Sequence, residues 1–118
     1  MVWVTAAARQ PPSPTHTMVF ALVASFRAVD AAAAERIVDL LGKVRNFALS
    51  ADEPGTLVYN PARKAADSLD FVVYEEYVDQ AALGAHVTST QFKTLEGEAD
   101  KLFVGGKEGL KIEYVNRF

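Results

Sequence analysis

Two apolar runs constrain the fold of this chain more than any other feature of its sequence. Residues 19–26 (VFALVASF) and 68–78 (SLDFVVYEEYV) are long enough for β-strands and too short for lone helices. In the second run apolar side chains fall on both faces, with Leu69, Phe71 and Val73 on one and Val72, Tyr74 and Val78 on the other. A sheet with one face in water alternates apolar and polar residues. These runs therefore predict a sheet that is covered on both faces.

Helical periodicity separates the two runs. Residues 31–50 place apolar side chains at i, i+3, i+4, i+7 and i+10, which is one face of a helix: Ile37, Leu40, Leu41, Val44 and Phe47. Asp30 is the expected N-cap. Asp39 and Lys43 have the i, i+4 spacing of an ion pair on the solvent side.

The rest of the chain predicts two more strands and two more helices. We expect strands at 56–60 and 110–115 and a polar loop at 61–67. Asp79 can cap a short helix through Ala85, and Thr88 with Gln91 has the spacing of a capping box before a further helix. The order βαββααβ predicts an α+β, ferredoxin-like fold with an antiparallel four-stranded sheet and helices on one face. The other face then needs a second cover, and we expect a homodimer packed sheet against sheet.

The composition of the chain limits where its folded domain lies and which partners and chemistries it can have. Residues 1–17 hold three prolines and no helical or strand period, so they predict a disordered or loosely packed tail before one domain at 18–118. The net charge of −3 and pI of about 5.3 disfavour nucleic acid and membrane surfaces as partners. Cysteine is absent, which excludes disulfides and thiolate chemistry, and we expect a cytoplasmic protein.

The motifs of common cofactors and metals are missing from the sequence. No GxGxxG follows the first strand, and no nucleophile elbow or HExxH-like spacing occurs. Only two histidines are present, and His16 lies in the tail. The segment Gly105-Gly106-Lys107 is followed by Glu108, where a phosphate loop has Ser or Thr, and we expect a turn there. The sequence therefore predicts neither a cofactor nor a metal.

Polar and aromatic residues gather around the second and third strands and the short helix. His86 is either a buried histidine that holds a loop by one hydrogen bond or a proton acceptor with a suitable intrinsic pKa. Glu75 is either a strand-end carboxylate paired with Lys or Arg or a site residue. Aromatic side chains of this region either belong to the core or wall a flat apolar ligand.

The third strand and the helix after it resemble the antibiotic biosynthesis monooxygenase (ABM) family. The family pattern is close to F-x-x-Y-E-x-W, then A-L-x-x-H. Here it is carried by Phe71, Tyr74-Glu75, Ala82-Leu83 and His86, with Tyr77 at the position of the Trp and Phe92 further on. The likeness spans roughly residues 19–114. It implies a dimeric α+β barrel with a pocket between sheet and helices. The haem-degrading branch is disfavoured, because Glu96 and an alanine stand at its His and Asn positions.

The resemblance also implies a function. Members of the family include oxygenases that use neither metal nor flavin and oxidise phenols, anthrones or hydroquinones with O₂. By this analogy His86 assists proton removal or holds the oxyanion, Tyr74 and Asn60 offer hydrogen bonds, and the substrate contacts five aromatic residues: Phe47, Tyr59, Phe71, Tyr77 and Phe92. Two alternatives stay open. One is a non-catalytic dimeric binding or stress-associated module that holds an apolar metabolite, favoured if side chains fill the cavity. The other is an isomerase or decarboxylase on the same scaffold.

Overall fold

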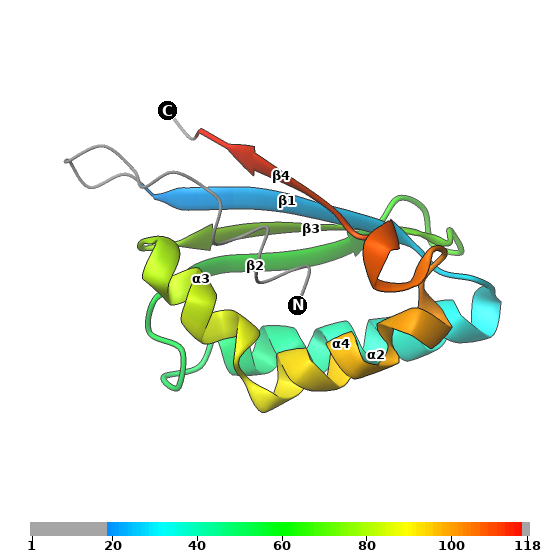
Figure 1. Cartoon of the computed structure of the whole chain (residues 1–118), viewed down its shortest axis with the longest axis horizontal. Helices are drawn as coiled ribbons and strands as arrows, with labels where there is room; N and C mark the ends of the chain where they lie inside the picture. The colour runs from blue at the N-terminus through cyan, green and yellow to red at the C-terminus, as the bar shows by residue number, and fades with distance from the viewer. Residues whose placement is uncertain (1–18, 117–118) are drawn as a thin grey trace.

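The computed structural model describes residues 19–116 and has strands on one side and helices on the other (Figure 1). Along the chain the elements are β1 (Phe20–Arg27), α2 (Ala31–Ala48), β2 (Thr56–Arg63), β3 (Asp70–Tyr77), α3 (Gln80–Val87), α4 (Thr90–Leu102), the 3₁₀ turn η1 (Gly106–Gly109) and β4 (Lys111–Val115). The predicted order βαββααβ and the α+β ferredoxin-like fold are confirmed. The tail predicted at 1–17 lies outside the described residues.

The sheet is antiparallel, with strand order β2-β3-β1-β4. All three helices lie against the same face of it, and no helix of the described chain covers the other face (Figure 1). Alternate residues of β3 therefore have different surroundings. Phe71, Val73, Glu75 and Tyr77 are buried on the helix face, whereas on the other face Val72 and Tyr74 are half-buried and only Glu76 is buried.

Stacked aromatic rings hold one end of the sheet to the helical layer. The Phe26 ring stacks on Phe71 at a centroid distance of 5.4 Å and on Phe103 at 4.2 Å. Below them α2 buries the predicted apolar stripe, except that Phe47 is only half-buried. Full burial of such side chains contributes roughly 1.5–3 kcal/mol each, which makes this layer contact the main stabilising feature of the domain.

Two local predictions were wrong. The second strand continues through Arg63 instead of ending at residue 60, and Pro61 lies within it. An edge strand accepts proline because one side of it has no ladder to complete, and β2 is an edge strand. The cap of α4 is Ser89, whose hydroxyl accepts from the Phe92 amide, whereas Thr88 ends α3 by donating to the Ala85 carbonyl. The caps predicted at Asp30 and Asp79 are confirmed.

The uncovered sheet face mixes apolar and polar side chains. Tyr74 is the register partner of Val23 on one side and of Asn60 on the other. Val58, Val72 and Val115 belong to the same face. Within residues 19–116 no helix is long and apolar enough to cross a membrane.

Candidate functional site

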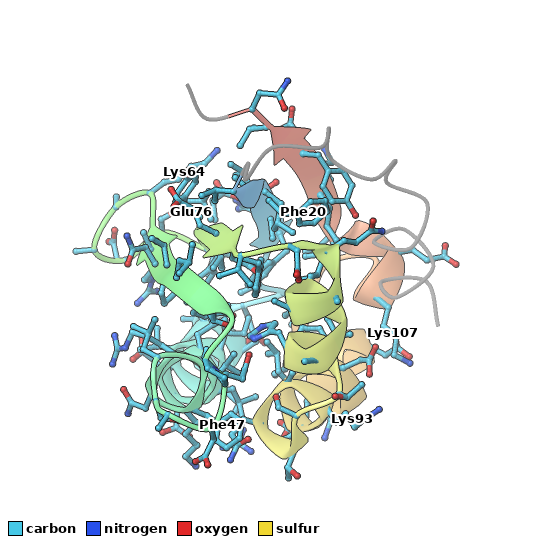
Figure 2. All side chains as sticks on the ribbon, turned by 90° about the vertical axis from the view of Figure 1, so that its left-hand side faces the viewer. Phe20, Phe47, Lys64, Glu76, Lys93 and Lys107 are labelled. Atoms are coloured by element: carbon cyan, nitrogen blue, oxygen red, sulfur yellow. The ribbon has the colours of Figure 1, made fainter. Side chains whose placement is uncertain are left out.

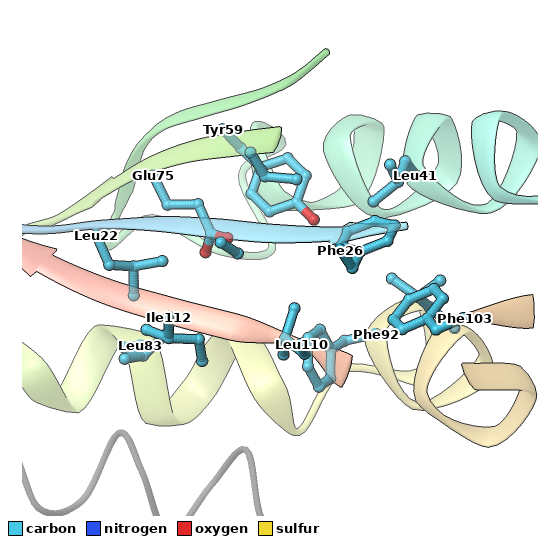
Figure 3. A pocket seen from close by; sticks show the side chains of 13 residues that line it. Leu22, Phe26, Leu41, Tyr59, Glu75, Leu83, Phe92, Phe103, Leu110 and Ile112 are labelled. Carbon is cyan, nitrogen blue, oxygen red and sulfur yellow. The ribbon is translucent and has the colours of Figure 1, made fainter. Parts of the chain in front are cut away.

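An apolar pocket opens between the sheet and helices α3 and α4 (Figure 3). Its free volume is about 50 Å³, which is room for a few water molecules. Eleven of the lining residues are apolar: Leu22, Ala24, Phe26, Leu41, Val73, Leu83, Phe92, Leu95, Phe103, Leu110 and Ile112. The two remaining lining residues, Tyr59 and Glu75, are polar, and both end in oxygen atoms that point into the pocket (Figure 3).

Tyr59 comes from β2, where the register with β3 turns its ring toward the helices. The residue is 2% exposed, and its hydroxyl has no hydrogen-bond partner among the described residues. Burial raises the pKa of the Tyr59 hydroxyl well above its ordinary value, and the negative charges of Glu75 and Glu53 add to this. Tyr59 is therefore neutral and offers a free donor to the pocket.

Glu75 comes from β3 and is 7% exposed. Its Oε1 accepts a hydrogen bond from the Tyr77 hydroxyl, so its partner is a tyrosine instead of the expected Lys or Arg. Burial raises the pKa of the Glu75 carboxyl. The charge of His86 and the Tyr77 hydrogen bond oppose this, while the charge of Glu53 reinforces it. A carboxyl with a raised pKa in an apolar pocket is suited to proton transfer.

His86 lies behind this pocket, on α3, and is 1% exposed. Its Nδ1 lies 2.8 Å from Oε1 of Glu53, which precedes β2 and also accepts from the Thr56 hydroxyl. The His86 ring packs against three aromatic rings, at centroid distances of 5.2 Å (Tyr59), 5.5 Å (Tyr77) and 5.4 Å (Phe92). This geometry matches the structural interpretation of His86, since the histidine ties the loop before β2 to α3 by one hydrogen bond.

The structure brings together only part of the predicted site. His86, Tyr59, Tyr77 and Phe92 form one cluster, and of these Tyr59 and Phe92 line the pocket.

The other four predicted residues lie elsewhere. Tyr74 and Asn60 are register partners on the opposite sheet face, where the Tyr74 hydroxyl donates to Glu76. Phe71 stacks on Phe26 beneath the Arg63 guanidinium, outside the pocket. Phe47 lies low in the helical layer, away from the sheet (Figure 2).

Sequence reasoning missed Glu53 altogether and left Glu75 out of the site. Glu53 belongs to the turn Asp52-Glu53-Pro54-Gly55, which predicts a helix stop and nothing more. Its partner His86 is 33 residues away in sequence, and only the tertiary fold brings the two together. Glu75 carried a better signal, because strand alternation placed it on the same face as Phe71 and Val73. Among residues 19–116, no group of three or more His, Asp or Glu side chains could hold a metal ion.

Comparison with known proteins places this chain in a family. The model of the family described as "Antibiotic biosynthesis monooxygenase" (ABM) matches residues 19–96, which is more than half of the chain. The chain belongs to the ABM family. The match covers β1 through the middle of α4 and so includes both polar residues of the pocket. No curated protein matches the sequence.

Solved structures share the ABM fold at low sequence identity. One is a "putative antibiotic biosynthesis monooxygenase" from Caulobacter crescentus, with a TM-score of 0.73, 24% identity, and coverage of 86% of this chain and 92% of that one. A protein of the same printed name from Nitrosomonas europaea has a TM-score of 0.74, 15% identity and coverage of 90% and 96%. Protein PA3566 of Pseudomonas aeruginosa has a TM-score of 0.67, 23% identity and coverage of 90% and 99%. At these identities the likeness concerns the fold.

Proposed function

We propose that this ABM-family protein is a cofactor-independent monooxygenase that oxidises a small phenol or hydroquinone with O₂. The observation that carries the proposal is the pocket. Its walls are apolar except for one neutral donor, Tyr59, and one carboxyl, Glu75. A phenol needs little more from a protein than an apolar cavity and groups that remove its proton and stabilise the anion.

The reaction balances without a further reductant. Removal of the hydroxyl proton gives an electron-rich phenolate, which passes one electron to O₂. Recombination of the resulting radicals forms a carbon–oxygen bond at the para carbon, and loss of water leaves the quinone. One phenol and one O₂ thus give one para-quinone and one water. A CH₂ group of an anthrone follows the same stoichiometry to C=O and water. A hydroquinone already carries the para oxygen, so it passes two electrons and two protons to O₂ and gives the quinone and H₂O₂ without a new carbon–oxygen bond.

The size of the pocket favours substrates with a single ring. A free volume of about 50 Å³ is well below the several hundred Å³ of most ligand sites, so a ring enters only if side chains at the rim move. Phe92, Leu110 and Ile112 are half-buried lining residues and are the ones positioned to do so. Anthrones need a larger displacement than a hydroquinone does.

The uncovered sheet face supports a second part of the proposal, namely that two chains pair through it. Val23, Val58, Val72 and Val115 lie on that face with Tyr74. Burying apolar side chains of this kind favours association by about 25 cal/mol per Å² of apolar surface. Sedimentation of the full chain tests this, and a monomer at micromolar concentration would contradict it.

Oxygen uptake tests the enzymatic proposal. The protein is incubated with hydroquinone, substituted phenols and anthrone, and we expect oxygen consumption with the single-ring compounds at one O₂ per quinone. With ¹⁸O₂, one labelled oxygen should appear in the product of a monophenol and the other in water. No uptake above the rate without protein, for any compound of the panel, would contradict an oxygenase role.

The small free volume also favours a second candidate function. A cavity largely filled by its own side chains is what a non-catalytic module would have, whether it holds a small apolar metabolite or none. The same panel separates the two. Binding of a phenol without oxygen uptake supports the module, and quinone formation excludes it.

A further inference from the structure

The two polar residues of the pocket, Tyr59 and Glu75, offer complementary hydrogen-bonding groups, one a donor and the other an acceptor. The Tyr59 hydroxyl is a donor with no partner among the described residues, although the residue is 2% exposed. Glu75 uses its Oε1 to accept from Tyr77, and its Oε2 has no hydrogen-bond partner among residues 19–116. Both residues line the free space of the pocket, so a ligand there can supply the acceptor for Tyr59 and the donor for Glu75.

The Tyr59 hydroxyl and the Glu75 carboxyl group line the same pocket from neighbouring strands. Tyr59 and Glu75 are register partners across β2 and β3, so their side chains leave the sheet side by side on the helix face. Figure 3 shows the Tyr59 hydroxyl next to Phe26 and the Glu75 carboxyl group further along the same pocket, toward Leu22. A single hydroxyl group is both an acceptor and a donor, and it can therefore satisfy both residues at once.

We propose that Tyr59 and Glu75 bind one hydroxyl of the ligand together, Tyr59 by donating to its oxygen and Glu75 by taking its proton. In this step the ligand O–H bond breaks, its electron pair stays on the ligand oxygen, and a new O–H bond forms on Glu75 Oε2. Tyr59 then donates to the oxyanion, and the summed charge of ligand and Glu75 stays at −1. The inference rests on the proposed function and assigns its proton acceptor to Glu75 in place of His86.

The surroundings fit a carboxyl that changes its charge. Five titratable groups interact electrostatically with Glu75: Glu53 before β2, Tyr59 on β2, Tyr77 on β3, His86 on α3 and Tyr114 on β4. Tyr77 donates to the Glu75 carboxylate, and the charge of His86 lowers the pKa of Glu75. Both stabilise Glu75 before it takes a proton, and neither lines the pocket.

If Tyr59 and Glu75 bind one hydroxyl together, the pocket should bind a ring that carries a hydroxyl more tightly than the same ring without one, because the bare ring leaves both protein groups unpaired. The probes are 4-nitrophenol and nitrobenzene, which differ only in the hydroxyl. Their affinities for the full chain are measured by calorimetry at a pH below the pKa of free 4-nitrophenol. We expect 4-nitrophenol to bind at least about tenfold more tightly, as hydrogen bonds to a charged group require.

Tyr59→Phe and Glu75→Gln should each reduce this preference to less than about threefold while nitrobenzene affinity stays within twofold. Glu75→Gln keeps an oxygen that can accept from Tyr77, and unchanged nitrobenzene binding shows that the pocket is intact. Glu76→Gln, a neighbouring glutamate on the opposite sheet face, is the matched control and should keep the preference.

The pairing would be overturned by equal affinities of the two probes for the wild type, by a preference that survives in both variants, or by failure of both probes to bind the folded protein. Oxygen uptake is a separate readout. A hydroxyl preference that depends on Tyr59 and Glu75 but comes without oxygen uptake overturns the proposed oxygenase and leaves this pairing standing. Oxygen uptake that both variants retain overturns the role of Glu75 and Tyr59 and leaves the proposed oxygenase standing.

Discussion

The Nδ1 atom of His86 lies 2.8 Å from Oε1 of Glu53, so that α3 and the loop before β2 are joined by a buried hydrogen bond. A carboxylate only accepts, which assigns a hydrogen to Nδ1 of His86. The same Glu53 oxygen accepts from Thr56 at 3.0 Å. One carboxylate therefore binds both the start of β2 and the histidine behind the pocket.

Removal of this carboxylate should destabilise the domain. Glu53→Ala leaves the Nδ1 hydrogen of His86 and the Thr56 hydroxyl buried without an acceptor, at a cost of about 1–3 kcal/mol. Glu53→Gln keeps an oxygen for them and should cost less than half as much. Urea unfolding measures both variants. Asp52→Ala, in the same loop but exposed, is the control and should stay within about 0.5 kcal/mol of the wild type. A loss in the control equal to that in Glu53→Ala would show that the loop, and not the buried pair, is responsible.

Glu75 should make stability depend on pH. Because burial raises the pKa of Glu75 in the folded state, folding favours its protonated form. This contribution is fully present below the ordinary pKa of a glutamate and is lost as pH rises through the raised value. Glu75→Gln cannot ionise, so the variant should become more stable relative to the wild type as pH rises.

Unfolding of the Glu75→Gln and wild-type proteins across the acid-to-neutral range tests this sign. A difference in unfolding free energy that does not change with pH would show that Glu75 has the same pKa in the folded and unfolded chains. Glu76→Gln, on the opposite face of the same strand, is the matched control.

The limits of sequence reasoning in this protein follow from particular residues. Periodicity was sufficient for the architecture, since the stripe from Ile37 to Val44 and the alternation in β3 are local properties. It also separated Tyr59 from Asn60 and Glu75 from Tyr74 by face. Periodicity could not show which face of the sheet holds the pocket, because both faces of β3 carry apolar residues. Tyr74 and Asn60 were therefore grouped with His86, and the pairing of Glu53 with His86 stayed hidden.

Two glycines near the site should respond in opposite ways to alanine. A Cβ at Gly55, just before β2, would lie 2.6 Å from the Ala82 Cβ of α3, whereas a Cβ at Gly84 meets nothing within 4 Å. Gly55→Ala should therefore cost about 1–3 kcal/mol through overpacking. Gly84→Ala lies in a helix and should stabilise the domain by up to about 1 kcal/mol.

A double variant checks that the clash is the cause. Because the crowding atom at Gly55 is the Ala82 side chain, Gly55→Ala with Ala82→Gly removes the overlap. After the helix penalty of the new glycine is measured in Ala82→Gly alone, the double variant should recover most of the loss. Strict additivity of the two single losses would mean that Gly55 is needed for another reason.

Two tyrosines on adjacent strands distinguish the sequence-based site from the structural one. Tyr74 was predicted to hydrogen-bond the substrate, yet its hydroxyl donates to Glu76 on the uncovered face, whereas Tyr59 offers its hydroxyl to the pocket. Given a phenol that the wild type oxidises, Tyr59→Phe should lower kcat/KM by about tenfold to a hundredfold, because an oxyanion loses its donor. Tyr74→Phe should change it by less than about threefold, and circular dichroism establishes that both variants are folded. The reverse order of losses would place the active site on the other face of the sheet, where a second chain could complete it.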